Sequence, residues 1–414
     1  MTDFAERARA ATAAMRDVFP PTPCQRNDYL SDRFGADIWL KREDLTPVRS
    51  YKLRGAFNAM RKLGGVRVAC ASAGNHAQGV AWMCRHLGVD GVIFMPVTTP
   101  GQKIDKTRLF GGDRVEIRLV GDFFDDTLAA AKAFCAEDGA HFLSPFDDDD
   151  VIEGQAAVAV EMIEQMDVLP DLIVSPVGGG GLTAGMLSYL RAVGRGLETV
   201  PEMRLVEPRG GASLTAALAA GHPVTLDRLD NFVDGAAVAR IGDRTFAHLS
   251  QVPERHVLRV PENRLCITIQ ELLNTEGIVL EPAGALSVDA LRDLGPEIEG
   301  RRVVCVTTGG NFDFERLPDV KERAMRFAGT KKYYVLRMPQ RPGALRDFLD
   351  ILGPRDDIAR FEYLKKSARN FGTVLIGIET DTPAAFERLE GEMEAIGFVW
   401  RDLSEDPMLG ELVI

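Results

Sequence analysis

Short apolar runs alternate with helical stretches from about residue 35 to residue 320, and this alternation constrains the fold more than any other feature. The runs Val66–Ala71, Leu172–Val177 and Val303–Thr307 are almost continuously apolar, as expected for strands buried on both faces. Helical patterns run from about Asn75 to His86 and from about Leu182 to Val193. Strands separated by helices form parallel sheets with helices on both faces. The sequence therefore predicts an α/β fold whose ligand sites lie beyond the carboxyl ends of the strands.

The last part of the chain follows a different pattern. A strand is expected over Tyr333–Met338, then a helix, two strands near 359–364 and 373–379, a second helix and a final strand near 398–403. The two helices have apolar stripes at helical spacing, formed by Leu345, Phe348, Leu349 and Leu352 and by Phe386, Leu389, Met393 and Ile396. The order βαββαβ is that of the ferredoxin-like split motif. We therefore expect a catalytic α/β domain over 1–325 and a small α+β domain over 326–414.

Composition and charge exclude several classes of protein. The formal net charge is −12 and no Lys/Arg-rich block occurs, so we expect no nucleic-acid partner. The six cysteines include no C-x-x-C pair and the six histidines no ligand spacing, so we expect no metal site and no disulfide framework. The N-terminus lacks the apolar segment of a signal peptide, and the uncharged stretch 172–190 is interrupted by Pro176 and five glycines. We expect a cytoplasmic protein without a membrane partner.

Four consecutive aspartates, Asp147–Asp150, follow the turn composition Ser144-Pro145-Phe146. Adjacent residues of a chain cannot all direct their carboxylates at one metal ion. We interpret this acidic run as a solvated loop or the beginning of a helix.

Lys52 is the first candidate for chemistry. A lysine amine is a poor nucleophile at its ordinary pKa of about 10.4, and burial or a neighbouring cation lowers that value. Arg49 and Arg54 flank Lys52, and we expect them to favour its neutral form. An isolated lysine is more often a surface charge, but Lys52 opens an apolar helix and is followed by the small residues Gly55 and Ala56. This context favours a buried, reactive lysine.

A turn of small residues follows the predicted strand that ends near Ala71. The turn comprises Ser72, Ala73, Gly74, Asn75 and His76 and leads into a helix, whose first backbone N–H groups attract anions. Asn75 adds a side chain that can donate to a phenolate or carboxylate oxygen, although such a turn also occurs as plain packing. We interpret His76 as structural, because no second histidine or carboxylate lies at a useful spacing.

Four consecutive glycines, Gly178, Gly179, Gly180 and Gly181, follow the second strand. Such a run costs chain entropy, and a cradle of backbone N–H groups for a phosphate would explain it. The sequence has neither the G-x-x-x-x-G-K-[ST] motif of nucleotide phosphate loops nor the G-x-G-x-x-G dinucleotide pattern here. The phosphate therefore belongs to another kind of ligand.

The third strand ends in Thr307-Thr308-Gly309-Gly310-Asn311. A hydroxyl at this position could meet a ring nitrogen of a ligand or simply cap the turn. A reactive lysine together with a phosphate cradle that lacks nucleotide motifs indicates pyridoxal 5′-phosphate, bound as a Schiff base.

These residues together resemble a known family. The segments KREDLTPVRSYKLRGA, ASAGNHAQGVA, PVGGGGL and EPAGA resemble the fold type II (tryptophan-synthase-β-like) pyridoxal phosphate enzymes, and among them the threonine dehydratases, or threonine ammonia-lyases, of isoleucine biosynthesis. The resemblance covers about residues 19–327 and implies two parallel-type sheet subdomains, the smaller over about 48–145. The tail resembles the ACT-like regulatory domain of the biosynthetic enzyme, present here in one copy.

The resemblance also implies roles for the candidate residues. Lys52 would bind the cofactor covalently, Asn75 would hydrogen-bond its 3′-oxygen, and Thr308 would face its pyridine nitrogen. The loop Gly178–Gly181 would cradle the phosphate, and the turn Ser72–His76 would receive the substrate carboxylate on its backbone amides.

The implied reaction is a β-elimination that converts L-threonine to 2-oxobutanoate and ammonia, with Lys52 as general base. Serine racemase, a relative, has a serine where this chain has Ala73, so the resemblance disfavours racemisation. The divalent-cation site of that relative begins at the position of Glu207, but its other acidic ligand falls near Ser213, so no metal site is carried over.

The regulatory domain implies isoleucine and valine as effectors, and the family implies a homotetramer. Two alternatives stay open. One is a dehydratase for serine or another β-hydroxy amino acid, because recognition of one methyl group contributes only about 1–3 kcal/mol. The other is a catalytically idle sensor that binds amino acids through the tail.

Overall fold

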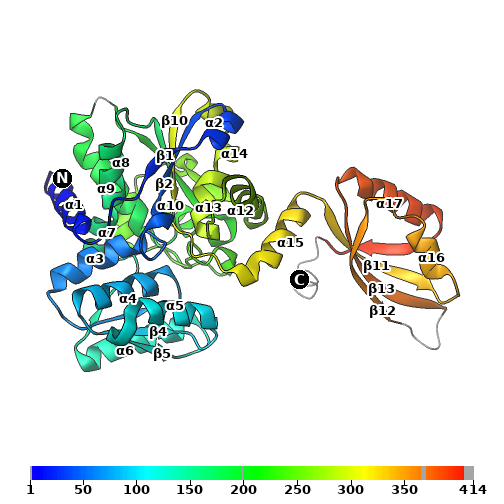
Figure 1. Ribbon diagram of the computed structural model, residues 1–414, viewed down its shortest axis with the longest axis horizontal. Helices are drawn as coiled ribbons and strands as arrows, with labels where there is room; N and C mark the ends of the chain where they lie inside the picture. The colour runs from blue at the N-terminus through cyan, green and yellow to red at the C-terminus, as the bar shows by residue number, and fades with distance from the viewer. Residues whose placement is uncertain (1, 198, 365–369, 405–414) are drawn as a thin grey trace. The chain divides into compact units, whose positions relative to one another are not determined.

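The computed structural model describes residues 2–197, 199–364 and 370–404, and the chain divides into two compact units, 1–312 and 313–414 (Figure 1). The expected boundary at 325/326 falls inside helix α15 (Leu317–Phe327), which the structure assigns to the second unit. The reason is a buried ion pair: Glu322 of α15 contacts Lys331, whose ammonium also lies 3.0 Å from Glu379.

The larger sheet of the first unit has six strands in the order β1-β2-β10-β7-β8-β9. All neighbouring strands are parallel except β1, which pairs antiparallel with β2. The strands are β1 Cys24–Arg26, β2 Asp37–Arg42, β7 Leu172–Pro176, β8 Glu202–Pro208, β9 Val257–Val260 and β10 Arg302–Thr307. Since β10 lies between β2 and β7, segments from both ends of this unit meet at the sheet centre.

The smaller sheet has four parallel strands in the order β5-β4-β3-β6. The strands are β3 Val68–Ala71, β4 Gly91–Met95, β5 Val115–Leu119 and β6 His141–Phe142. One face packs against α3 (Lys52–Leu63) and α4 (Asn75–Leu87), and the other against α6 (Phe124–Asp138). The sequence-based expectation of parallel sheets covered on both faces is confirmed.

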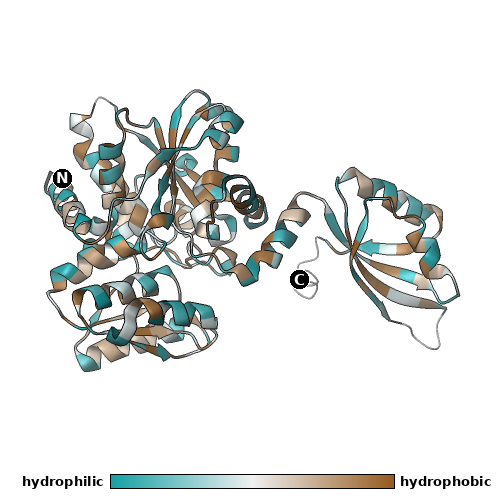
Figure 2. Cartoon of the chain, viewed as in Figure 1, coloured by the Kyte–Doolittle hydropathy of each residue, from teal (hydrophilic) through white to brown (hydrophobic). Residues whose placement is uncertain are grey.

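The remaining helices of the first unit surround these two sheets (Figure 1). They are α1 Thr2–Arg16, α2 Asp28–Phe34, α5 Gly101–Gly111, α7 Asp149–Gln155, α8 Ala157–Gln165, α9 Gly181–Val193, α10 Ser213–Ala220, α11 Asp243–Leu249, α12 Glu262–Glu276, α13 Pro282–Asp289 and α14 Leu291–Leu294. Helices α8 and α9 cover one face of the larger sheet through a buried cluster that includes Ile173, Leu205 and Val304. The hydropathy view shows hydrophobic sheet strands surrounded by helices with polar outer surfaces (Figure 2).

The stretch 172–190 forms strand β7 and most of helix α9. Its proline is the last residue of β7, and its four consecutive glycines span the loop and the first residue of α9. In the described ranges, no helix is both long enough and apolar enough to cross a membrane.

The second unit contains an antiparallel sheet in the order β12-β13-β11-β14. Its elements follow in the order β11 Lys331–Pro339, α16 Ala344–Leu349, β12 Asp357–Leu364, β13 Phe371–Glu379, α17 Ala384–Ala395 and β14 Val399–Asp402. This confirms the βαββαβ order. The core of the unit is built from Tyr334, Phe348 and Phe386 among others. Helix α16 is shorter than its apolar stripe predicted, so Leu352 follows the helix.

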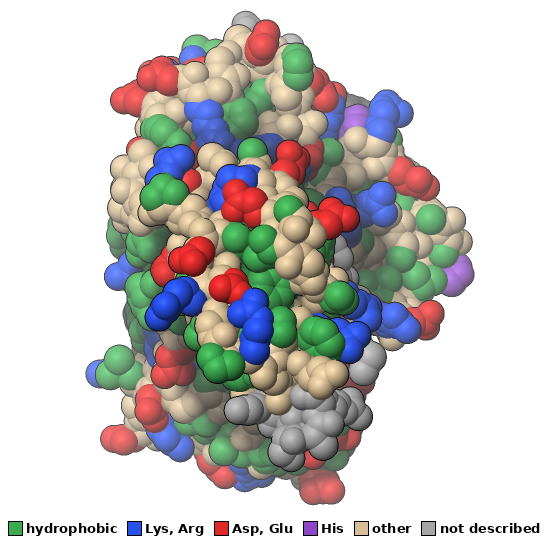
Figure 3. All heavy atoms as spheres, turned by 90° about the vertical axis from the view of Figure 1, so that its right-hand side faces the viewer, with side chains coloured by type: hydrophobic (Ala, Val, Ile, Leu, Met, Phe, Trp, Pro, Cys, Tyr) green, Lys and Arg blue, Asp and Glu red, His purple; other side chains and the backbone are tan. Residues whose placement is uncertain are grey.

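The surface of the molecule mixes charge types. On the face that Figure 3 presents, basic and acidic side chains alternate with scattered apolar ones, and no continuous basic patch is visible there. Several large apolar side chains of the second unit are exposed, among them Leu345, Leu349 and Val399.

Candidate active site

The segment before Lys52 is held against the end of β10. The amide of Tyr51 donates to the carbonyl of Thr308 at 3.1 Å, and the amide of Gly310 donates to the carbonyl of Arg49 at 2.9 Å. Arg49 has φ +60, a left-handed conformation that a residue with a side chain adopts rarely. Lys52 then begins helix α3. This backbone pairing places the predicted Schiff-base lysine beside the predicted ring-nitrogen partner Thr308.

The ammonium of Lys52 lies in an enclosed, partly aromatic environment. It donates to the carbonyl of Pro145 at 2.7 Å and lies 5.3 Å from the ring centroid of Tyr51 and 5.9 Å from that of Phe146. Burial lowers the pKa of Lys52 to about 8, although the carboxylate of Glu281 opposes this shift. The neutral, nucleophilic amine is therefore accessible near neutral pH.

The expectation that flanking arginines lower this pKa is wrong. Arg54 points into a buried polar cluster, where its guanidinium lies 2.7 Å from Glu43 and 2.7 Å from Glu161. The charge of Arg54 is therefore balanced by the carboxylates of Glu43 and Glu161. Desolvation is what lowers the pKa of Lys52.

The turn Ser72–His76 lies next to the beginning of α3, because α4 packs closely there. A Cβ atom at Gly79 of α4 would lie 3.3 Å from the backbone nitrogen of Leu53, so glycine allows this approach. Within the turn, Ser72 Oγ accepts from the amide of Gly74 at 3.2 Å. The backbone amides at the beginning of α4 are thus presented beside Lys52.

His76 is a buried residue of the core. Its Nε2 lies 3.0 Å from the carbonyl oxygen of Leu143, and burial, assisted by the nearby charge of Lys52, lowers its pKa to about 3. The ring is therefore neutral at physiological pH. This arrangement agrees with the structural interpretation of the His76 side chain.

Asn75 is held by hydrogen bonds on both sides of its amide. Its Nδ2 donates to Glu281 at 2.6 Å, and its Oδ1 accepts from Nδ2 of Asn311 at 2.6 Å. The side-chain oxygen of Asn311 in turn accepts from Lys106. Because Glu281 accepts and Asn311 donates, the amide orientation of Asn75 is fixed and one N–H hydrogen remains for a further acceptor.

The loop Gly178–Gly181 tolerates no side chain. A Cβ atom at Gly179 would overlap the ring of Phe146, and one at Gly180 would lie 2.9 Å from Oγ1 of Thr245. Gly180 also has φ +90, which favours glycine. Within the described part of the chain, the amides of Gly178, Gly179 and Gly180 donate to no other backbone group. The loop therefore presents free N–H groups at the N-terminus of α9, as an anion cradle requires.

Thr307 is the last residue of β10 and Thr308 follows it, and their hydroxyls differ in their contacts. The hydroxyl of Thr307 bonds the carbonyl of Lys41 at 3.0 Å and the carboxylate of Asp44 at 2.9 Å. Thr308 is buried as a residue, but its hydroxyl oxygen is not among the fully buried unpaired atoms, and it forms no hydrogen bond with the residues that the structure describes. Thr307 is thus part of the framework, and Thr308 is free to meet a ligand.

The structure adds neighbours that the sequence did not identify as site residues. Glu281 contacts Asn75, Phe146 covers the glycine loop, and Thr245 donates to the carbonyl of Gly179 at 2.7 Å. Glu281 lies in the segment EPAGA, which was noted for its resemblance alone, and Phe146 lies in the turn before the acidic run. The position of Thr245 carries no comparable sequence signal.

Glu207 has a structural function in this chain. Its carboxylate accepts from the amides of Leu214 and Thr215 at 2.6 and 2.9 Å, at the beginning of helix α10. Burial raises its pKa to about 7. Among the described residues, no three His, Cys, Asp or Glu side chains come together in a group able to hold a metal ion.

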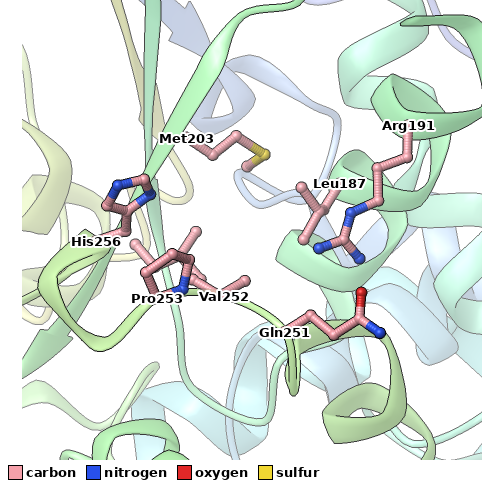
Figure 4. A pocket seen from close by; sticks show the side chains of 8 residues that line it. Leu187, Arg191, Met203, Gln251, Val252, Pro253 and His256 are labelled. Carbon is pink, nitrogen blue, oxygen red and sulfur yellow. The ribbon is translucent and has the colours of Figure 1, made fainter.

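A separate pocket lies away from these residues (Figure 4). It is lined by Leu187 and Arg191 from the second half of α9 and by Met203 and His256 among others. The last residue of the glycine loop, Gly181, is the first residue of the same helix, so the pocket and the cradle are at opposite ends of α9.

Comparison with known proteins agrees with this geometry. Residues 15–309 match the family described as pyridoxal-phosphate dependent enzymes, and residues 322–413 match the C-terminal regulatory domain of threonine dehydratase. The biosynthetic L-threonine dehydratase of Bacillus subtilis (strain 168) is 47% identical over 97% of this chain and 95% of the relative.

Solved structures give the same result. The processed form of threonine deaminase isoform 2 from Solanum lycopersicum has a TM-score of 0.72 and 35% identity, over 78% of this chain and 94% of that one. A second threonine deaminase, from T.th., has a TM-score of 0.69 and 30% identity, over 75% of this chain and 98% of that one. The chain therefore belongs to the pyridoxal-phosphate-dependent enzymes, and within them to the family of biosynthetic L-threonine dehydratases with a C-terminal regulatory domain.

Proposed function

We propose that this protein is a threonine ammonia-lyase that converts L-threonine to 2-oxobutanoate and ammonia by β-elimination, with Lys52 as its catalytic lysine. The observation that carries this proposal is that three other chain segments are linked to the segment of Lys52: Thr308 through the amide of Tyr51, the glycine loop through Phe146, and Asn75 through Glu281. We assign four groups to one site: the Lys52 amine, the remaining N–H of Asn75, the free amides of Gly178–Gly180 and the unpaired hydroxyl of Thr308.

The residues present fit pyridoxal phosphate. The glycine loop offers oriented N–H groups for its phosphate. Glycine allows this conformation because a Cβ atom at any of these positions would crowd neighbouring atoms. Asn75 offers a fixed N–H for the 3′-oxygen, and Lys52 would hold the cofactor covalently through Nζ. When bound, the cofactor supplies a sink for the electrons left at the substrate α-carbon.

Thr308 offers a neutral hydroxyl where the pyridine nitrogen would lie. A carboxylate there would keep the nitrogen protonated and strengthen the electron sink. A neutral partner would leave the cofactor a weaker electron sink, which would suit elimination of the β-hydroxyl.

Lys52 also serves as general base. Burial lowers its pKa to about 8, toward the neutral range in which a general base is efficient. In the cofactor-free protein the hydrogen bond to the Pro145 carbonyl fixes the position of Nζ.

The turn Ser72–His76 would bind the substrate carboxylate through its backbone amides at the beginning of α4. Ala73 lies in this turn and carries no acidic hydrogen. This position therefore supplies no proton donor opposite Lys52, which favours elimination over racemisation.

The second unit is the proposed binding domain for an amino-acid effector, with isoleucine as inhibitor and valine as its antagonist. We further propose that the protein acts as a homotetramer in the cytoplasm. The catalytic set is intact in this chain, which argues against the alternative of an idle amino-acid sensor.

The deciding experiment measures keto-acid release by purified protein loaded with pyridoxal phosphate. L-threonine and L-serine are compared at equal concentration, with and without isoleucine, and the Lys52→Ala variant is the control. We expect faster formation of 2-oxobutanoate from threonine than of pyruvate from serine, loss of at least about 10³-fold of the rate in Lys52→Ala, and inhibition by isoleucine. A higher kcat/KM for serine would establish the serine dehydratase alternative, and a rate retained in Lys52→Ala would refute the proposed mechanism.

A further inference from the structure

The acidic run Asp147–Asp150 does not act as a unit. Asp148 caps α7, accepting from the amides of Asp150 and Val151 at 2.8 and 3.0 Å. Asp149 pairs with the guanidinium of Arg244, and Asp150 lies 2.6 Å from the ammonium of Lys62. The four carboxylates therefore diverge, and each needs its own explanation.

Asp147 supplies the N-terminal cap that helix α11 lacks. The residue before this helix is Gly242, which has no side chain to cap with, and a Cβ atom there would overlap Oδ1 of Asp147. The Asp147 carboxylate accepts from three consecutive amides, those of Asp243 at 3.2 Å, Arg244 at 2.8 Å and Thr245 at 3.2 Å. A residue almost one hundred positions earlier thus fixes the first turn of α11.

The same turn of α11 holds the glycine loop. Oγ1 of Thr245 donates to the carbonyl of Gly179 at 2.7 Å. It also lies 2.9 Å from the position that a Cβ atom of Gly180 would occupy. The amide of Thr245 is held by Asp147, so one residue connects the carboxylate to the loop. Displacement of this turn would displace the carbonyl of Gly179 and reorient the amides on either side of it.

The residues before Asp147 contact the other components of the site. The carbonyl of Pro145 accepts from Lys52, the ring of Phe146 lies against Gly179, and the backbone and Cβ of Phe146 lie against Gly181. Pro145 therefore contacts the catalytic lysine, and Phe146 contacts one side of the loop. Asp147 reaches the other side of the loop through α11. Asp147 directly follows these two residues, so a shift at Asp147 would also move them.

We propose that Asp147 is a positioning residue that sets the conformation of the loop Gly178–Gly181 for the cofactor phosphate. This inference rests on the proposed function, in which the loop is the phosphate cradle. It assigns to Asp147 a function in cofactor retention that its neighbour Asp149, exposed and paired only with a side chain, does not share.

The test compares the full-length apoprotein with its Asp147→Ala, Asp147→Asn and Asp149→Ala variants. Each is titrated with pyridoxal 5′-phosphate and, separately, with pyridoxal, which lacks the phosphate, and binding is followed by the visible absorbance of the lysine adduct. We expect Asp147→Ala to weaken binding of pyridoxal phosphate by about tenfold, the size of a lost helix cap, and to leave binding of pyridoxal unchanged. Asp147→Asn keeps one acceptor oxygen and should recover most of the loss, and Asp149→Ala should match the wild type.

A second variant covers the case in which Asp147→Ala does not fold. Thr245→Val removes only the hydroxyl that reaches Gly179, and it should show the same selective loss. Equal weakening of both ligands, or unchanged binding of pyridoxal phosphate in Asp147→Ala and Thr245→Val, would overturn the inference. Wild-type protein that forms no adduct with either ligand would overturn the proposed function, and the inference with it.

Discussion

The side-chain amide of Asn75 donates a 2.6 Å hydrogen bond to the carboxylate of Glu281, a buried acid that lies near enough to Lys52 to affect its pKa. Burial, reinforced by Asp234, raises the pKa of Glu281 to about 7. The partner that fixes Asn75 therefore changes its charge in the physiological pH range.

This raised pKa predicts a pH-dependent stability. Because folding raises the pKa of Glu281, the protonated acid favours the native state; this contribution is complete below the ordinary carboxyl pKa and is lost as the pH rises through about 7. Apoprotein should lose on the order of 2–3 kcal/mol of unfolding free energy from this group between pH 5 and pH 8. Urea unfolding at both pH values measures the loss, and Glu281→Gln should abolish it.

Glu207 provides the matched comparison, because burial raises its pKa to about 7 as well. Glu207→Gln should also reduce the loss of unfolding free energy with rising pH. Only Glu281→Gln, however, should alter cofactor affinity. Equal pH slopes in wild type and Glu281→Gln would show that Glu281 stays charged throughout this range.

A second prediction concerns the effect of a side chain in the glycine loop on cofactor affinity. Gly179→Ala places a methyl group into the ring of Phe146, and overpacking of this kind typically costs about 1–3 kcal/mol. We expect a loss of cofactor affinity of about tenfold or more, read from the same absorbance titration. Gly101→Ala is the control, because nothing lies within 4 Å of its Cβ position. Normal cofactor binding by Gly179→Ala would mean that the loop adjusts without cost.

A third prediction concerns the buried polar cluster behind α3. Glu161 lies 2.7 Å from Lys41 and 2.7 Å from Arg54, and all three side chains are buried. Neutralising it leaves two buried cations short of a partner, so Glu161→Gln should cost about 3–5 kcal/mol in urea unfolding. Glu164→Gln, on the same helix but in an exposed pair with Arg16, should cost no more than about 1 kcal/mol. Similar costs for both variants would contradict this account.

The second unit offers a stabilising substitution. Gly391 is an exposed residue inside α17, and nothing lies within 4 Å of its Cβ position. Gly391→Ala should therefore raise the unfolding free energy of this unit by about 0.5–1 kcal/mol, which thermal unfolding of the full chain can detect. Gly377→Ala should do the opposite, because its Cβ atom would lie 2.6 Å from the ring of Tyr333. A destabilised Gly391→Ala would show that this glycine has a function not evident from its surroundings.

The sequence revealed those features that depend on neighbouring residues. Lys52 at the beginning of its helix, the glycine run and the turn before α4 are local patterns, and the parallel sheets follow from the alternation of strands and helices. The sequence could not reveal that the Arg54 side chain turns away from Lys52, because Glu161, the partner of Arg54, lies 107 residues later in the chain. Glu281 and Asp147 were missed for the same reason, since only tertiary folding brings them to Asn75 and to α11.

The place of β10 in the larger sheet has a consequence for synthesis on the ribosome. The four strands of the smaller sheet lie within residues 68–142, so this sheet can form while the rest of the chain is still being made. Strands β2 and β7 stay unjoined until Arg302–Thr307 has left the exit tunnel, because only β10 pairs with both. In the nascent protein, the edges of β2 and β7 that pair with β10 therefore stay exposed to other chains until late in translation. The site around Lys52 is completed among the last parts of this unit.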